Sequence, residues 1–314
     1  MRRWWWVILL ILVLIGLGYY WFVPPVNPPR WNEEVVSGSG PDKIALIQIS
    51  GIITPEPSSS WGGMTPPGAD DWISQLEQAQ ADPAVKAIVL DLETPGGDVV
   101  TTDRVYQALL DFKDQSSKPV VAAMGTVAAS GGFYLAMAAD EVFAGSNTIT
   151  GSIGVISQLP EYRELAETIG FGMRVFKSGP LKDMGSPLRP ITTEEAAVFQ
   201  ALVDQAYGRF VEVVAAGTEM SEAEVRPLAD GRIYTGAQAQ QLGLIDEIGY
   251  QDKAITRAAE LARAVDPLVV RYYQPVGFAE LFWGMLGPKP GPAEVALNSV
   301  LPSAPLEYRW LGGF

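Results

Sequence analysis

One serine in the sequence stands where a chain could present a nucleophile. Ser130 follows two alanines and precedes two glycines in TVAASGGFYLA (residues 126–136), and the run after it favours a helix. A small-residue turn followed by a helix leaves backbone amides free to face the serine side chain. The stretch therefore indicates a reactive serine.

The group that accepts the proton of such a serine cannot be a histidine. The 314-residue chain contains no histidine and no cysteine, which excludes Ser-His-Asp triads, Cys-His pairs, zinc-thiolate sites and disulfides. A neutral lysine is the established substitute, and the pKa of such a lysine must fall from about 10.4 to about 7–8 through burial away from carboxylates. We expect neither a metal nor a cofactor.

The surroundings of the eight lysines reduce the number of candidates for the general base. Six begin a strand, lie in the tail, or sit beside aspartate or at ends of elements that look solvated, which leaves Lys177 and Lys182 in FKSGPLKDMGSP (residues 176–187). Glycine and proline around Lys182 allow a loop that aims its side chain inward, whereas Lys177 lies on a predicted strand. This favours Lys182 modestly and leaves Lys177 open. The adjacent Asp183 would have to point away, because a nearby carboxylate favours the charged amine.

Glycine-containing turns follow three predicted strands and could supply an oxyanion hole. They are TPGGD (residues 94–98), AASGG (128–132) and TGSIG (150–154). In a parallel sheet, loops beyond the carboxyl ends of strands gather at one edge. An oxyanion hole needs two donors about 3 Å from the developing charge. Gly97 or Gly96 could supply one amide and Gly131 the other. In isolation, TPGGD is more typical of a tight strand-to-helix turn. The sequence around Ser152 by itself indicates only a turn residue.

The elements that must position these turns alternate between strands and helices. Apolar and β-branched runs predict strands at residues 43–54, 85–93, 118–125, 141–145 and 173–179. Helical spacing predicts helices at residues 69–80, 99–113, 160–170 and 192–217. This alternation predicts an α/β domain with a mostly parallel sheet.

The N-terminal block, residues 1–23, predicts a membrane anchor. The twenty residues from Trp4 to Val23 carry no charge and would form about 30 Å of helix, with aromatic residues at both ends. Arg2 and Arg3 precede the block, so the positive-inside rule leaves the N-terminus in the cytoplasm. A cleaved signal peptide is the alternative, but its apolar region would be shorter and would end at small residues.

The remaining chain divides into three predicted parts. Residues 24–41 are rich in Pro, Gly, Ser and Asn and indicate a linker, residues 42–266 hold the α/β domain, and residues 267–314 form a tail. The tail contains VGFAELFWGML (residues 276–286), which has the spacing of a short helix. A net charge of −14 and a pI near 4.5 argue against nucleic-acid binding.

Five motifs in a fixed order resemble those of the bacterial signal peptide peptidase A family. They are ETPGGDV, TVAASGGFYLA, ITGSIGV, KSGPLKDMGSP and GRIYTGAQAQQLGLIDEIG. The match runs from about Lys43 to about Arg263. It implies the Clp-protease/crotonase fold and a membrane-anchored serine peptidase. The chain resembles the short form of the family, since the long form carries two such domains in tandem.

The resemblance assigns roles to particular residues. Ser130 matches the serine of the SGG motif and is implied to be the nucleophile. Lys182 matches the lysine of the KD pair and is implied to be the general base. Ser152 matches the serine of GSIG, whose hydroxyl would hold the lysine amine in place. The PGG motif implies an oxyanion amide at Gly97, with Gly96 shaping the turn.

The resemblance also implies an assembly, a substrate and a location. In the long form the serine and the lysine belong to different domains, so Lys182 of one protomer is expected to serve Ser130 of its neighbour in a ring-like homo-oligomer. The expected substrates are hydrophobic peptides such as cleaved signal peptides. The expected location is the bacterial cytoplasmic membrane, with residues 4–23 as a single span in the lipid bilayer and the catalytic domain outside the cytoplasm.

Two other classes of protein remain as alternatives. A crotonase-like acyl-CoA enzyme would share the fold and the oxyanion hole, but it would normally be cytosolic and use carboxylates, so the anchor and Lys182 count against it. A non-catalytic membrane scaffold would be indifferent to the replacement of Ser130.

Overall fold

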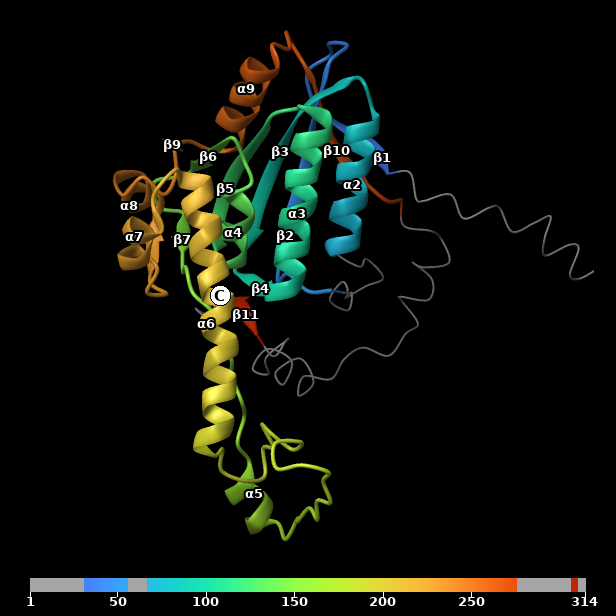
Figure 1. Ribbon diagram of the computed structural model, residues 1–314. Helices are drawn as coiled ribbons and strands as arrows, with labels where there is room; N and C mark the ends of the chain where they lie inside the picture. The colour runs from blue at the N-terminus through green and yellow to red at the C-terminus, as the bar shows by residue number, and fades with distance from the viewer. Residues whose placement is uncertain (1–30, 56–66, 276–305, 310–314) are drawn as a thin grey trace, which may run out of the picture.

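The computed structural model describes residues 31–55, 67–275 and 306–309, and these form a mixed α/β body from which an arm projects (Figure 1). The body is built on a nine-stranded sheet, in which seven strands follow the order β1-β10-β2-β3-β5-β6-β9, β7 pairs with β5, and β8 pairs with β7. Most pairs in this sheet are parallel, and β1–β10 and β7–β8 are antiparallel. The predicted α/β class with a mostly parallel sheet is confirmed.

The strands of this sheet are short at its edges and long at its centre. Their bounds are Asn32–Ser37 (β1), Lys43–Ser50 (β2), Val85–Thr94 (β3), Val120–Ala129 (β5), Glu141–Ala144 (β6), Ile149–Gly151 (β7), Ile233–Thr235 (β8), Glu247–Ile248 (β9) and Leu268–Tyr273 (β10). A separate two-stranded sheet pairs Gly96–Asp98 (β4) with Glu307–Arg309 (β11). The central strands are buried on both faces, which explains their nearly continuous apolar sequences.

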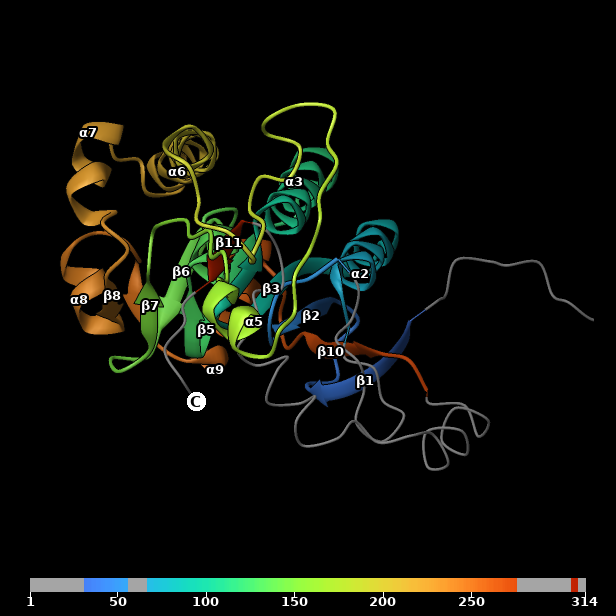
Figure 2. The same ribbon diagram turned by 90° about the horizontal axis from the view of Figure 1, so that it is seen from below.

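Helices cover both faces of the sheet (Figure 2). The helices are Ala69–Ala81 (α2), Val99–Ser116 (α3), Gly131–Ala136 (α4), Arg163–Thr168 (α5), Thr193–Thr218 (α6), Glu222–Val225 (α7), Gly236–Gln241 (α8) and Gln251–Ala262 (α9). On one face α2, α3, α4 and the second half of α6 enclose the larger core, to which Trp72 and Phe112 contribute. On the other face Ala254 and Ala258 of α9 pack against Val89.

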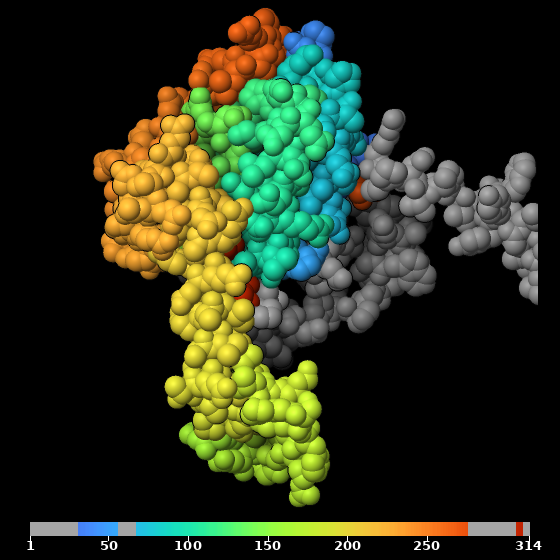
Figure 3. Space-filling model, viewed as in Figure 1, coloured from blue at the N-terminus to red at the C-terminus, as the bar shows by residue number. Residues whose placement is uncertain are grey.

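Residues 157–202 form the arm, which extends away from the body (Figures 1 and 3). The 26 residues of α6 make a helix about 39 Å long. Its N-terminus is fixed by a capping box, in which Thr192 and Glu195 bond to each other's backbone amides. Four apolar residues in the second half of α6, Phe210, Val211, Val213 and Val214, are buried, so this half anchors the arm in the body.

The structure departs from the sequence prediction in several segments. The strand predicted at residues 173–179 is wrong, because this part of the arm has no neighbouring strand to pair with and is exposed. The sheet also includes β1, which lies in the predicted linker 24–41, and β10, which lies in the predicted tail 267–314. β10 pairs with both β1 and β2, so both segments join the body through contacts distant in sequence.

Other predictions fall on residues that the structure does not describe. The anchor at residues 4–23 and the tail helix at residues 276–286 lie outside the described ranges. Across the three described ranges, no helix is both long enough and apolar enough to cross a bilayer.

Candidate active site

Ser130 lies at the junction between β5 and α4, in a backbone conformation that residues other than glycine rarely adopt. The φ of Ser130 is +52°, and the residue is 1% exposed. The Ser130 amide donates to the Gly151 carbonyl over 2.7 Å, and the Ser130 carbonyl accepts from Tyr134 over 2.8 Å. Backbone strain of this kind persists where surrounding structure enforces it, and it is concentrated at functional sites.

Ser152 lies beside Ser130 because of the register between two strands. β5 and β7 are parallel and pair Ala129 with Gly151, so the next residue of each strand is a serine at the same edge of the sheet. Ser152 also has a positive φ, of +50°, and its amide donates to the Arg232 carbonyl over 2.8 Å. Two strained serines therefore stand next to each other at the carboxyl ends of neighbouring strands.

The glycine turn after β3 directs successive backbone amides to opposite sides of β4. The Gly96 amide donates to the Thr94 hydroxyl over 3.0 Å. On the side facing Ile53, the Ile53 amide donates to Gly96 and the Asp98 amide donates to Ile53. Because backbone groups alternate in direction along a strand, the amide of Gly97 faces the opposite side of β4. The Gly96 amide is thus already used, and Gly97 is the better oxyanion donor of the two.

Gly131 brings a second amide to the same place. It is the first residue of α4, where backbone amides lack partners within the helix. A Cβ built on Gly96 would lie 2.6 Å from the Gly131 nitrogen, so the two glycine backbones are in direct contact. Ser130, Ser152, Gly97 and Gly131 therefore lie close together at one edge of the sheet.

Lys182 does not join this group within the single chain. It lies in the arm and is exposed, and its backbone amide donates to Gly179 over 3.2 Å. Within the described residues, the Lys182 side chain makes no hydrogen bond or ion pair, and no hydrogen bond links it to Ser130 or Ser152. The structure therefore assembles the serines and the amides but leaves the lysine apart from them.

The carboxylate next to Lys182 is bound by other residues. Asp183 accepts from Lys177 over 2.7 Å and from Arg189 over 2.8 Å. These hydrogen bonds hold the pKa of Asp183 well below its usual value, and the bond from Arg189 contributes most. Arg189 also pairs with the buried Glu195 at the start of α6. The Asp183 carboxylate is thus bound by Lys177 and Arg189 and makes no ion pair with Lys182, and Lys177 is held in an ion pair.

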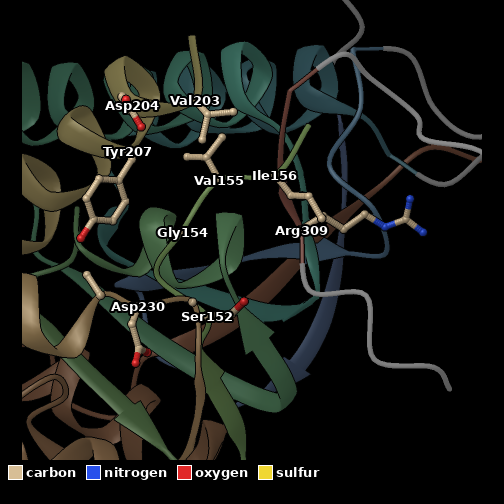
Figure 4. Close-up of a pocket in the computed structure, with 11 residues that line it drawn as sticks. Ser152, Gly154, Val155, Ile156, Val203, Asp204, Tyr207, Asp230 and Arg309 are labelled. Carbon is tan, nitrogen blue, oxygen red and sulfur yellow. The ribbon is translucent and has the colours of Figure 1, made fainter. Parts of the chain in front are cut away.

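A pocket of about 460 Å³ opens beside Ser152 (Figure 4). Residues from the segment after β7, from α6, from the loop before β8 and from β11 enclose it: Ser152, Gly154, Val155, Ile156, Val203, Asp204, Tyr207, Ala229, Asp230, Gly231 and Arg309. A side chain that enters from outside the chain could reach the Ser152 hydroxyl through this opening.

The sequence analysis missed the residues that occupy the groove beside β4. β11, near the end of the chain, pairs antiparallel with β4 and places Tyr308 opposite Gly97. Tyr134, four residues after Ser130, lies under this groove and donates to Asp103 over 2.5 Å. Burial and the contact with Asp103 raise the pKa of Tyr134. Nothing in the three residues Glu-Tyr-Arg signals a strand, because the pairing is distant in sequence.

Acidic residues do not form a metal site in the part of the chain that the structure describes. No group of three or more potential ligands is close enough there to hold a metal ion.

Two known families match the chain in sequence. Peptidase family S49 matches residues 112–265, a range that includes Ser130, Ser152 and Lys182. The Clp protease family matches residues 62–149, in agreement with the mixed α/β architecture of the body.

Individual relatives share a large part of the chain. A protein of Enterococcus faecium named signal peptide peptidase SppA is 36% identical over 254 residues, which cover 81% of this chain and 74% of that protein. Protease 4 of Haemophilus influenzae is 33% identical over 221 residues, or 70% of this chain and 35% of that protein. The chloroplastic serine protease SPPA of Arabidopsis thaliana is 34% identical over 238 residues, which cover 74% of this chain and 34% of that protein. These matches confirm the resemblance that the five motifs indicate.

Proposed function

Because the chain belongs to peptidase family S49 and is a serine peptidase, we propose that it cleaves hydrophobic peptides with Ser130 as the nucleophile and Lys182 as the general base. The observation that carries the assignment of Ser130 is its position. It is buried, has a positive φ, and begins the short helix whose first amide, that of Gly131, meets the glycine turn of β4.

The proposed reaction is acyl transfer to the serine followed by hydrolysis. The Ser130 hydroxyl attacks the peptide carbonyl while the neutral amine of Lys182 takes its proton. The amides of Gly97 and Gly131 stabilise the oxyanion of the tetrahedral intermediate, and each such donor typically contributes about 3 kcal/mol to transition-state stabilisation. Lys182 then gives the proton to the leaving amine. A water molecule activated by the same lysine cleaves the ester and regenerates Ser130.

Ser152 is proposed to position the lysine. Ser152 is 8% exposed and lies next to Ser130 because of the β5–β7 register. It also lines the pocket that opens to solvent. A hydroxyl at this point can accept a hydrogen bond from an amine that enters the pocket and fix that amine near Ser130.

The lysine is proposed to come from a second copy of the chain in a ring-like homo-oligomer. In the single chain Lys182 is exposed and makes no side-chain bond to the described residues. Large apolar residues of the arm are also exposed, among them Ile169 at 69%, Met173 at 64% and Phe176 at 89%. An exposed apolar patch of this kind marks an interaction surface. Burial of this patch by a neighbour would bring Lys182 into an environment where a neutral amine is favoured.

The substrate and the location are proposed from the N-terminal sequence and from the relatives. The uncharged run from residue 4 to residue 23 is long enough to span a bilayer once, and the arginines before it place the N-terminus in the cytoplasm. The body would then lie outside the cytoplasmic membrane of a bacterium, close to the lipid. One relative is named as a signal peptide peptidase. Hydrophobic peptides such as cleaved signal peptides are therefore the proposed substrates, cut at internal bonds.

The alternatives of a crotonase-like acyl-CoA enzyme and a non-catalytic scaffold have less support. The family that matches is a peptidase family, and its matched range covers the region that carries Ser130 and Lys182. No observation in the described residues favours either alternative.

Labelling of the full chain with a fluorophosphonate, which reacts with activated serines, tests the proposal. The full chain in detergent should be labelled at Ser130 and should hydrolyse a hydrophobic reporter peptide, and Ser130→Ala should abolish both. Ser117→Ala is a matched control, because Ser117 also has a positive φ, of +55°, but caps α3. Labelling that survives in Ser130→Ala would refute the assignment.

A further inference from the structure

The loop that carries Lys182 has no regular secondary structure to hold it. It connects α5 to α6 in the arm (Figure 1), and residues 169–192, all of which the structure describes, contain no helix or strand. The Lys182 amide donates to the Gly179 carbonyl over 3.2 Å, in an isolated turn. Exposed backbone of this kind opens easily, so the position of Lys182 depends on side-chain contacts of the same loop.

One arginine binds the residue that follows Lys182 in the chain. The Nε atom of Arg189 donates to one carboxylate oxygen of Asp183 over 3.1 Å, and its Nη2 atom donates to the other oxygen over 2.8 Å. Nη2 also donates to the backbone carbonyl of Asp183 over 3.0 Å. Two-point binding of a carboxylate by a guanidinium is strong and directional. Because Arg189 holds both the side chain and the backbone of Asp183, it fixes the chain immediately beside Lys182.

The same guanidinium is attached to the start of α6. Nη1 of Arg189 donates to a carboxylate oxygen of Glu195 over 2.9 Å, and Nη2 donates to the other oxygen of this carboxylate. The Glu195 side chain is 1% exposed and also accepts from the Thr192 amide over 3.0 Å, as part of the capping box of α6. Glu195 is therefore a fixed point on the long helix of the arm, and Arg189 connects the loop of Lys182 to it.

This connection requires the shape of an arginine side chain as well as its charge. A guanidinium presents five donors in a planar fork, and that of Arg189 contacts two carboxylates and a backbone carbonyl together. An ammonium in its place is a point charge on a flexible stem and cannot reproduce this set of contacts. Lys177 also binds Asp183, but it adds a single contact, over 2.7 Å, to the carboxylate. The loop is thus held mainly by Arg189.

We propose that Arg189 is a positioning residue for the general base, which fixes the loop of Lys182 in the shape that fits the site of a neighbouring chain before the two chains meet. This inference rests on the proposed function. The Lys182 side chain makes no bond to the described residues of its own chain, so its amine is delivered accurately only if its backbone is fixed. A displacement of about 1 Å at a reacting group can lower the rate about 100-fold.

Steady-state kinetics of full-length variants in detergent test this role. We expect Arg189→Ala to lower kcat about 100-fold while KM stays within about two-fold, because the body that binds the peptide is unchanged. Arg189→Lys should lose nearly as much, since it keeps the charge and loses the fork. Arg226→Ala is the matched control, because it breaks a half-exposed pair with Glu222 on the body, and it should behave like the wild type. Wild-type kcat in Arg189→Ala or in Arg189→Lys would overturn the inference.

Complementation shows in which half of the site Arg189 acts. Arg189→Ala is co-expressed in equal amounts with Ser130→Ala or, separately, with Lys182→Ala. In the first mixture about one quarter of the sites combine an intact serine with a lysine loop that carries Arg189, so about a quarter of the wild-type activity should return. In the second mixture an intact serine meets either a loop without Lys182 or a loop without Arg189. Its activity should therefore stay at about 1% of the wild type or below.

The outcomes separate this inference from the proposed function. Recovery in the second mixture alone would overturn the inference, because Arg189 would then act on the serine side. Failure of both mixtures, while Ser130→Ala with Lys182→Ala recovers activity, would also overturn it, because Arg189 would then be needed for assembly. If Ser130→Ala with Lys182→Ala forms mixed assemblies without activity, delivery of the base by a neighbour fails. The kinetics of Arg189→Ala and Arg189→Lys then still decide whether Arg189 positions Lys182.

Discussion

The two residues of the proposed catalytic pair lie in regions that are built in opposite ways. Ser130 belongs to the body, where it is 1% exposed and held in a strained conformation by β5, β7 and α4. Lys182 belongs to the arm, where it is exposed. Near it Phe176 is 89% exposed, whereas phenylalanines of the body such as Phe133 are fully buried.

This difference indicates what one chain can and cannot fix by itself. Parallel register places Ser130 and Ser152, and helps to place the proposed oxyanion amides, without help from another molecule. The arm carries a lysine and apolar side chains whose partners do not lie among the described residues of the same chain. The central claim is therefore that the body supplies the nucleophile and that the arm supplies the base to a neighbouring body.

Replacement of the lysine should have the largest effect on activity with the smallest effect on the fold. We expect Lys182→Ala to lower kcat by on the order of 10³-fold or more, as loss of a member of a catalytic unit does. The melting temperature should change little, because the side chain is exposed and makes no bond to the described residues. Lys177→Ala, which breaks an exposed ion pair with Asp183, is the control and should remain active. The reverse pattern would exchange the roles of the two lysines.

Glycine-to-alanine substitutions should separate the body from the arm. In Gly97→Ala the new Cβ would lie 2.0 Å from the Ile53 carbonyl oxygen, so β4 must shift and the oxyanion amide with it. We expect kcat/KM to fall by about 100-fold or more, and stability to fall as well. In Gly172→Ala, on the arm, the Cβ would meet nothing within 4 Å. Kinetics and thermal unfolding of both variants provide the measurement, and an inactive Gly172→Ala would show that the arm is packed in a way the single chain does not reveal.

Replacement of an exposed apolar residue should weaken assembly when it lies on the arm and not when it lies on the body. Phe176 and Val265 are 89% and 83% exposed, and they lie on the arm and beside α9 respectively. Phe176→Ser should shift the oligomer toward monomer in sedimentation, by about 10-fold in the dissociation constant, since a buried aromatic contributes about 1.5–3 kcal/mol. Val265→Ser should leave the distribution unchanged. Equal behaviour of the two variants would remove the arm from the interface.

Acid should loosen the loop of the arm before it affects the sheet. Arg189 holds the pKa of Asp183 well below its usual value and lowers that of Glu195 to about 2. Groups with lowered folded-state pKa values stabilise the fold above their unfolded pKa values, near 4, and lose this contribution as pH falls through the folded values. Hydrogen exchange, corrected for intrinsic rates, should therefore show increased opening of residues 180–195 between about pH 4 and pH 2. Arg189→Gln should show this opening already at neutral pH, and a pH-independent loop in the wild type would contradict the prediction.

The sequence predicts the secondary structure of the body better than that of the arm. Strands β2, β3 and β5 and helices α2, α3 and α6 follow from local periodicity, because each buries one face or both faces within the chain. The strand predicted at residues 173–179 failed for the opposite reason. Its apolar pattern is that of a segment to be buried, but Met173 and Phe176 are exposed in the single chain. We propose that a neighbouring copy of the chain buries these side chains.

Some residues of the candidate site have a local signal in the sequence, whereas others depend on pairing between distant segments. Strand-end glycines and a serine before a helix indicated Ser130, Gly97 and Gly131, since these features are local. The proximity of the two strained serines depends on the register of β5 against β7, which only the structure gives. Tyr308 could not be found from sequence, because a three-residue strand that pairs with a turn about 210 residues earlier leaves no local pattern.

Complementation between two inactive variants tests whether the serine and its base come from different chains. Ser130→Ala and Lys182→Ala are each expected to be inactive, and both should assemble like the wild type. When the two are co-expressed in equal amounts, random mixing in a ring gives about one quarter of the sites an intact serine beside an intact lysine from the neighbour. The account predicts recovery of about a quarter of the wild-type activity. Mixed assemblies that form but remain inactive would contradict it, and would place the serine and its base in one chain.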